Sequence, residues 1–212
     1  MPQLIDISVR LRPDMPVWPG SAGIRLESTQ SLAAGGAANV TRLDMDVHCG
    51  THVEGPLHLI EGGDPLESYP IEVFVGPAWV AHFPDVRRIG PEDLELAGIP
   101  NEFDRVLLRT PNSTFWQNET HAFRTDYAAL TREGAAWMVE RGVRLVGVDY
   151  LSVQLFGDAP ETHRILMRSS VAILEGLNLG LVEPGPYRLS CLPLRLAGAE
   201  AAPARAILET LA

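Results

Sequence analysis

The chain has 212 residues, of which 46% are hydrophobic, and its formal net charge is -10, from 27 acidic residues against 17 lysines and arginines. Because its few basic residues are scattered, nucleic acid and anionic membranes are excluded as expected partners, and a small molecule is favoured. No apolar run suits a membrane span or a secretory leader, and no linker divides the chain, so we expect one cytoplasmic domain over residues 1–212.

The first element that the sequence predicts is a strand over residues 43–48. Its side chains, Leu-Asp-Met-Asp-Val-His, alternate between apolar and polar, which is the period of a strand with one buried face. This alternation places His48 on the polar face. The stretch before it, residues 31–38, is rich in small residues and predicts a flexible loop.

Residues 48–58 hold half of the chain's six histidines together with one glutamate, namely His48, His52, Glu54 and His58. Imidazole nitrogens and carboxylate oxygens are ligands that divalent cations such as Zn²⁺ and Mn²⁺ accept. The pattern therefore predicts a metal site, and the alternative is a chance cluster in a surface loop.

The same stretch is not expected to be a helix. A zinc-protease helix has a glutamate directly after its first histidine, whereas this chain has Cys49 there, followed by Gly50 and later by Gly55 and Pro56. Glycine and proline at these positions favour a strand that runs into a loop. Cys49 is a candidate ligand or nucleophile, but packing is its favoured role because in extended chain it points away from His48. Two cysteines offer no disulfide framework.

Further along the chain, short apolar runs predict buried strands and two patterns predict helices. The strands are expected at Ala78–Ala81, Val106–Leu108, Leu145–Val148, Val171–Leu174 and Arg205–Leu208. A short helix is expected to begin at Pro91, and a longer one should run from Thr131, as N-cap, to Arg141, before Gly142. Together these elements predict a mixed, strand-rich α/β fold.

The run from His48 to His58, with Gly50, Thr51 and Pro56 at fixed places within it, strongly resembles the signature of the cyclase family of metal-dependent hydrolases, which includes bacterial kynurenine formamidases (arylformamidases). Segments with the family's order continue through the chain. They are Asp6–Ser8, Pro16–Gly20, Arg105–Thr110, Leu145–Asp149, His163, Leu174–Leu177, Leu192–Leu194 and Pro203–Ala206.

The resemblance implies roles that composition and spacing do not supply. His48, His52 and Glu54 match the ligands of a first metal ion, and Glu54 also matches a carboxylate that bridges to a second. His163 and Glu175 match the remaining ligands of that second ion.

The same resemblance implies that His58 is the general acid/base and that Trp18 lies against an aromatic substrate. The implied fold is the swivelling β/β/α architecture, and the implied assembly is a homodimer or homotetramer. The implied cofactor is one or two divalent ions, Zn²⁺ or Mn²⁺.

Two departures from the family pattern affect these expectations. Glu54 replaces the usual aspartate and reaches about 1.5 Å farther, so we expect one tightly held ion and a weak or empty second position. The run Tyr150–Gln154 reads Tyr-Leu-Ser-Val-Gln, where the formamidases have a run of the Thr-Pro-Ser-Val-Asp type. This difference indicates a branch that is not committed to kynurenine metabolism.

The predicted function is hydrolysis of a small aromatic or cyclic amide, such as an N-formyl arylamine, by metal-bound hydroxide with His58 as the general acid/base. The alternative within the family is a hydrolase of cyclic imides, lactams or lactones, or an enzyme that closes such rings. A non-catalytic, metal-bearing binding protein is the alternative from another class. The presence of His58, which holds no metal in the family scheme, favours an enzyme.

Overall fold

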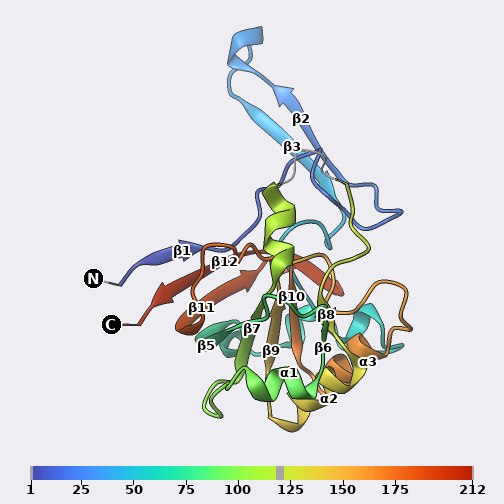
Figure 1. Ribbon diagram of the computed structural model, residues 1–212. Coiled ribbons are helices and arrows are strands. Elements are labelled where there is room, and N and C mark those ends of the chain that lie inside the picture. Colours follow the sequence, from blue (N-terminus) through green and yellow to red (C-terminus); the bar gives the residue numbers. More distant parts are fainter. Residues whose placement is uncertain (1, 118–121, 212) are drawn as a thin grey trace.

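Seven strands form a closed, barrel-like ring in the computed structural model, which describes residues 2–117 and 122–211 (Figure 1). In ring order they are β12 (Ala201–Thr210), β11 (Gly185–Pro193), β5 (Val75–His82), β7 (Arg105–Arg109), β9 (Leu145–Val148), β10 (Ala172–Glu175) and β4 (His52–Glu54). The ring closes because β4 also pairs with the first residues of β12. An eighth strand, β1 (Leu4–Asp6), pairs with the other end of β12.

Four neighbouring strands of the ring, β5, β7, β9 and β10, run parallel, and helices cross between them. These helices are α1 (Pro91–Leu96), α2 (Arg132–Glu140) and α3 (Glu161–Arg168). Strand β7 could be predicted from its apolar run because both of its faces are buried. Leu107 packs in the core inside the ring, whereas Val106 and Leu108 pack in the core beneath the helices. The predicted mixed, strand-rich α/β fold is confirmed.

The two predicted helices are present, and a third was missed. The Thr131 hydroxyl caps α2 by accepting a hydrogen bond from the Gly134 amide at 3.0 Å, and Pro91 occupies the first turn of α1. The segment that forms α3 was not predicted to be helical. Pro160 at its N-cap position offers no side-chain cap, so the most specific signal of a helix start is missing, although Glu161 lies in the first turn.

A hairpin of β2 (Ile24–Gln30) and β3 (Val40–Met45) projects from the ring (Figure 1). The predicted loop at residues 31–38 lies in its connection, where it includes a short 3-10 turn, η1 (Leu32–Ala34). The prediction that the strand continues to His48 is wrong. The chain turns after Met45, where the Cys49 amide donates to the Asp46 carbonyl at 3.0 Å, so His48 lies in a turn.

The remaining elements are short. They are the 3-10 turns η2 (Pro56–His58), η3 (Leu66–Ser68), η4 (Ile71–Val73) and η5 (Pro111–Gln117) and the paired strands β6 (Arg88–Ile89) and β8 (Ala129–Leu130). Cys49 is buried with Met15 and Ile24, which confirms the packing role predicted for it. Among the described residues, no helix has the length and apolar character needed to cross a bilayer.

Candidate metal centre

Strand pairing places three of the predicted ligands on one face of the ring. β4 runs antiparallel to β10, and His52 lies directly opposite Glu175. Glu54 follows His52 by two residues, so it points to the same face. Val53 and Leu174 point to the other face and pack in the core inside the ring. His52, Glu54 and Glu175 are all buried, on the face where Ile173 of β10 packs beneath the helices.

The missed helix α3 supplies the fourth group. Its His163 is buried, and Nε2 of the ring lies 3.2 Å from Oε1 of Glu54 and 3.4 Å from Oε1 of Glu175. His52 approaches Glu175 from the opposite side, with its Nε2 3.6 Å from Oε2. Glu175 therefore lies between imidazoles from two elements, β4 and α3, and Glu54 shares the contact with His163.

Two glycines hold the motif turn against the end of β10. Gly50 and Gly176 both have a φ of +70°, and a Cβ atom on Gly176 would lie 2.1 Å from the Gly50 carbonyl oxygen. The Thr51 hydroxyl donates to the Gly176 carbonyl at 2.6 Å. A side chain at position 176 would therefore overlap the Gly50 backbone and push the motif turn away from the end of β10.

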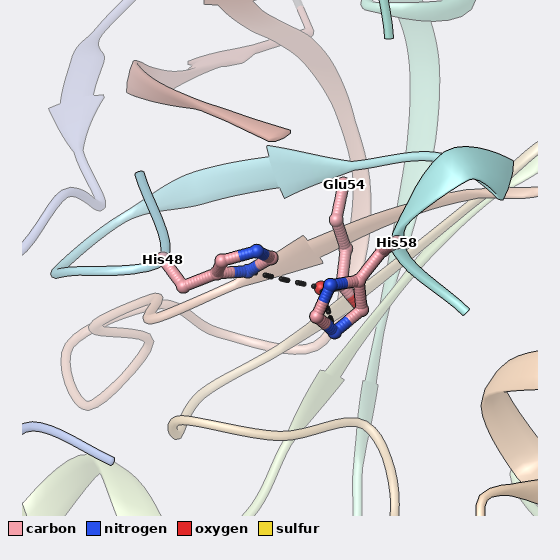
Figure 2. Close-up of side chains that lie close together, drawn as sticks. All are labelled: His48, Glu54 and His58. Carbon is pink, nitrogen blue, oxygen red and sulfur yellow. Dashed lines mark ion pairs between the residues drawn. The ribbon is translucent and has the colours of Figure 1, made fainter. Parts of the chain in front are cut away.

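The other two histidines of the motif approach Glu54 from the open side. Figure 2 shows the rings of His48 and His58 directed toward the Glu54 carboxylate, with Nδ1 of His48 3.2 Å and Nε2 of His58 3.6 Å from Oε2. Nδ1 of His48 is also 3.3 Å from Nε2 of His52. Oε1 of Glu54 faces His163, so its two oxygens are directed to different sets of imidazoles.

The electrostatics of the cluster show that it attracts positive charge. Burial opposes the charged form of His163, yet contacts with Glu175 and Glu54 raise the pKa of its imidazole to about 10. Burial and the neighbouring Glu54 charge raise the pKa of Glu175 to about 7. Burial alone would raise the pKa of Glu54, but its contacts with His163 and His48 hold it well below the usual range.

His52 behaves differently because burial lowers its pKa to about 4. At neutral pH it is an uncharged imidazole, which is the form that binds a metal. Its Nδ1 lies 3.0 Å from the Gly50 carbonyl, an acceptor, so Nδ1 carries the proton and Nε2 presents its lone pair to the cluster.

These groups fit a divalent cation. Two sets of donor atoms lie within 4.8 Å of one another, His52 with Glu54 and Glu175, and His48 with Glu54 and His58. Within the described residues, Oε1 of Glu54 and Nε2 of His48 are buried without an aligned hydrogen bond. Such buried polar atoms are costly unless something else satisfies them. Oxygen and imidazole donors of this kind are suited to a divalent cation.

A cavity of about 610 Å³ opens onto the cluster, and its wall includes Glu54, Glu175, His163, His48 and His58. It is large enough for a small organic molecule. Trp18 also lines it, and the Trp18 ring contacts the rings of Phe123 and Phe156 at centroid distances of 5.2 and 5.8 Å. Trp18 and Phe156 are each 42% exposed. An aromatic surface thus borders the polar centre.

Six of the seven predicted site residues line this cavity, and His52 lies behind its wall against Glu175 and His48. Two further residues near the centre were not predicted. Glu200, directly before β12, lies 3.4 Å from Nε2 of His48. Nothing in the sequence around Glu200 indicates a role. Gln154 lines the cavity and contacts His163. It lies in the run that departs from the family pattern, and this departure could have indicated a role for Gln154 at the site.

Comparisons with known proteins agree with this geometry. The sequence profile of the Cyclase family matches residues 5–154. The chain is 38% identical to cyclase-like protein 3 of Arabidopsis thaliana over 97% of this chain and 79% of the relative. It is 35% identical to the kynurenine formamidase of Maricaulis maris over 100% of both chains. A solved structure described as a potential metal-dependent hydrolase with cyclase activity matches with a TM-score of 0.85 and 29% identity over 100% of both chains.

Proposed function

The chain belongs to the cyclase family and is a metal-dependent hydrolase of amide C–N bonds, and on this premise we propose that its substrate is a small aromatic amide of the N-formyl arylamine type. The observation that carries the proposal is the adjacency of the His and Glu cluster to an aromatic wall in one cavity. A formyl group held at the cluster would leave its aryl ring beside Trp18.

The residues that would hold the metal follow from the donor sets. His52, Glu54 and Glu175 would hold one ion, with His163 beside both carboxylates. In the second set, His48 and Glu54 would hold the other ion, and His58 is assigned to proton transfer instead. When bound, a divalent ion supplies a water of lowered pKa, about 7 in known zinc enzymes, and polarises a carbonyl oxygen.

His58 is placed to move the proton. It lies on η2 at the cavity wall, and burial lowers the pKa of its imidazole, so the ring is neutral at pH 7 and accepts a proton from water. The resulting imidazolium is stabilised by Glu54, whose Oε2 is 3.6 Å from Nε2. Nε2, having taken up the proton, then donates it to the departing amine, which makes the leaving group neutral.

Trp18 and its aromatic neighbours would select the substrate. The Trp18 ring lies edge to face against Phe123 at an interplanar angle of 75° and is tilted at 58° to Phe156. An aryl group packed on this surface replaces water around exposed aromatic area, which favours aromatic over aliphatic amides.

The test is a substrate screen on protein loaded with Zn²⁺ or with Mn²⁺. Formanilides should be hydrolysed faster than formyl-alkylamines of equal size, and the Trp18→Ala variant should lose this preference. Faster turnover of cyclic imides, lactams or lactones would assign the chain to the ring-opening alternative. Metal binding without turnover of any of these compounds would support the binding-protein alternative.

A further inference from the structure

The segment that follows β9 contacts metal-ligand candidates on two different elements. The Val153 amide donates to Oε1 of Glu175, on β10, at 2.7 Å. One residue later, the side chain of Gln154 lies 3.3 Å from Nδ1 of His163, on α3. Neither Val153 nor Gln154 belongs to the donor sets themselves. The segment therefore forms hydrogen-bonding contacts with both Glu175 and His163.

The orientation of the Gln154 amide is determined by its other contact. Nε2 of Gln154 lies 3.0 Å from the carbonyl oxygen of Asp158, and a carbonyl can only accept a hydrogen bond. The amide nitrogen must therefore face Asp158. Oε1, which can only accept, must face His163.

Gln154 is also held in place along its backbone. Its backbone carbonyl oxygen accepts a hydrogen bond from the Tyr127 hydroxyl at 2.7 Å, and its backbone N–H donates to the Ser152 hydroxyl at 3.2 Å. Its side chain is nearly buried at the cavity wall. With both ends of the residue fixed, the amide cannot turn to offer its nitrogen to His163.

An oxygen facing Nδ1 has a direct consequence for His163. Nδ1 must carry a proton to form this hydrogen bond, so in the neutral ring the lone pair is on Nε2. Nε2 is the atom that faces Oε1 of Glu54 at 3.2 Å and Oε1 of Glu175 at 3.4 Å. We infer that Gln154 is a positioning residue that directs the lone pair of His163 toward the two carboxylates, for a cation held among them.

The inference rests on the proposed function, because it concerns the same metal centre. It adds that the residue behind His163 is a neutral amide. An aspartate or glutamate at this point would place another negative charge beside Glu54 and Glu175, whereas Gln154 fixes the ring without adding charge.

The first test is long-range ¹H–¹⁵N NMR of protein labelled with ¹⁵N-histidine and loaded with Zn²⁺, with the His163 signals assigned from the His163→Gln variant. The spectrum should show the proton on Nδ1 of His163 and the metal-facing lone pair on Nε2. In metal-free protein the Nδ1 proton should exchange slowly with water. This slow exchange should disappear in Gln154→Met, which has similar length but no amide oxygen to hold the Nδ1 proton.

The second test is the affinity for Zn²⁺ measured by chelator competition. Gln154→Met should weaken binding by about 10–100-fold, the usual effect of losing a partner of a liganding histidine. Gln154→Glu keeps an oxygen acceptor and should retain both the tautomer and most of the affinity. Gln30→Met, on the exposed strand β2, is the matched control and should change neither.

The results separate the two ideas. A proton on Nε2 of His163 in the unmodified protein loaded with Zn²⁺, or equal Zn²⁺ affinity in Gln154→Met, would overturn the positioning role even if formanilides are hydrolysed. Zn²⁺ binding with the expected NMR signature but no hydrolysis would overturn the substrate proposal and leave the positioning role standing. If Gln154→Met does not fold, the tautomer of the unmodified protein and the Gln154→Glu affinity decide the question.

Discussion

The contact between Gly176 and Gly50 gives a sharp prediction for the Gly176→Ala variant. At a φ of +70° an alanine costs about 1–2 kcal/mol. The new Cβ would also lie 2.1 Å from the Gly50 carbonyl oxygen, more than an ångström short of the 3.4 Å at which ordinary contact begins. Relieving this overlap moves backbone on both sides and costs a further ~1–3 kcal/mol.

Gly142→Ala is the matched control. Its φ of +71° is nearly the same, but a Cβ there has no atom within 4 Å, so it incurs only the conformational cost. The difference in free energy of unfolding between the two variants should be ~1–3 kcal/mol, which is about 2–12 °C in Tm for a chain of this size. Differential scanning calorimetry and denaturant unfolding measure it.

Metal binding provides the second readout for the same pair. Displacement of Gly176 from Gly50 moves Glu175 away from His52, so Gly176→Ala should lose Zn²⁺ affinity while Gly142→Ala retains it. Equal destabilisation of the two variants, together with unchanged metal content, would refute the argument that the close approach of these glycines builds the centre.

Four further predictions concern the site and the assembly. His58→Ala should retain its metal and fold while turnover falls by about 10²–10⁴-fold, whereas His52→Ala should lose metal and activity together; equal metal loss in both would make His58 a ligand. Glu54→Asp should raise the number of ions bound per subunit, measured by elemental analysis, and two firmly held ions in the unmodified protein would contradict the expected weak second position. The metal-free His163 has a pKa of about 10, so a metal must displace its proton at neutral pH. Zn²⁺ affinity should therefore rise with pH toward 10, and binding should release a proton that calorimetry in different buffers detects. Zn²⁺ affinity that falls with rising pH would count against this prediction. Light scattering should show a homodimer or homotetramer, and a monomer would remove that prediction.

The parts of the fold that the sequence predicted are those whose signals are local. The apolar runs of β7 and β9 are buried on both faces, so they contain no polar residue and could be recognised as strands. Thr131 caps α2 with its own side chain, three residues from its partner. The motif from His48 to His58 is likewise contiguous, so the sequence predicted a metal site there although the position of His48 in a turn was missed.

The parts that were missed depend on distant contacts. His48 was placed on a strand because residues 43–48 alternate, but the pairing with β2 ends at Met45 and the chain then turns. The closure of the ring joins β4 to β12, which a period-two pattern does not reveal. Glu200 reaches His48 only because of that closure, so no signal near residue 200 could have identified it.

Ring closure also determines when, during synthesis, the centre can exist. Strand β4 has no partner until β10 and β12 are made, which is more than a hundred residues later. Contacts this distant are slow to form, because the entropy of closing a long loop is lost before the pairing repays it. Until then, three histidines lie within eleven residues of open chain, and metal bound by an unfolded chain reduces the stabilisation that the native state gains from the same ion. In a zinc-rich medium a nascent chain would therefore bind its ion before it folds, and the ion would then stabilise folding less. A chain that receives the ion only after β12 has emerged from the ribosome would obtain the larger stabilisation.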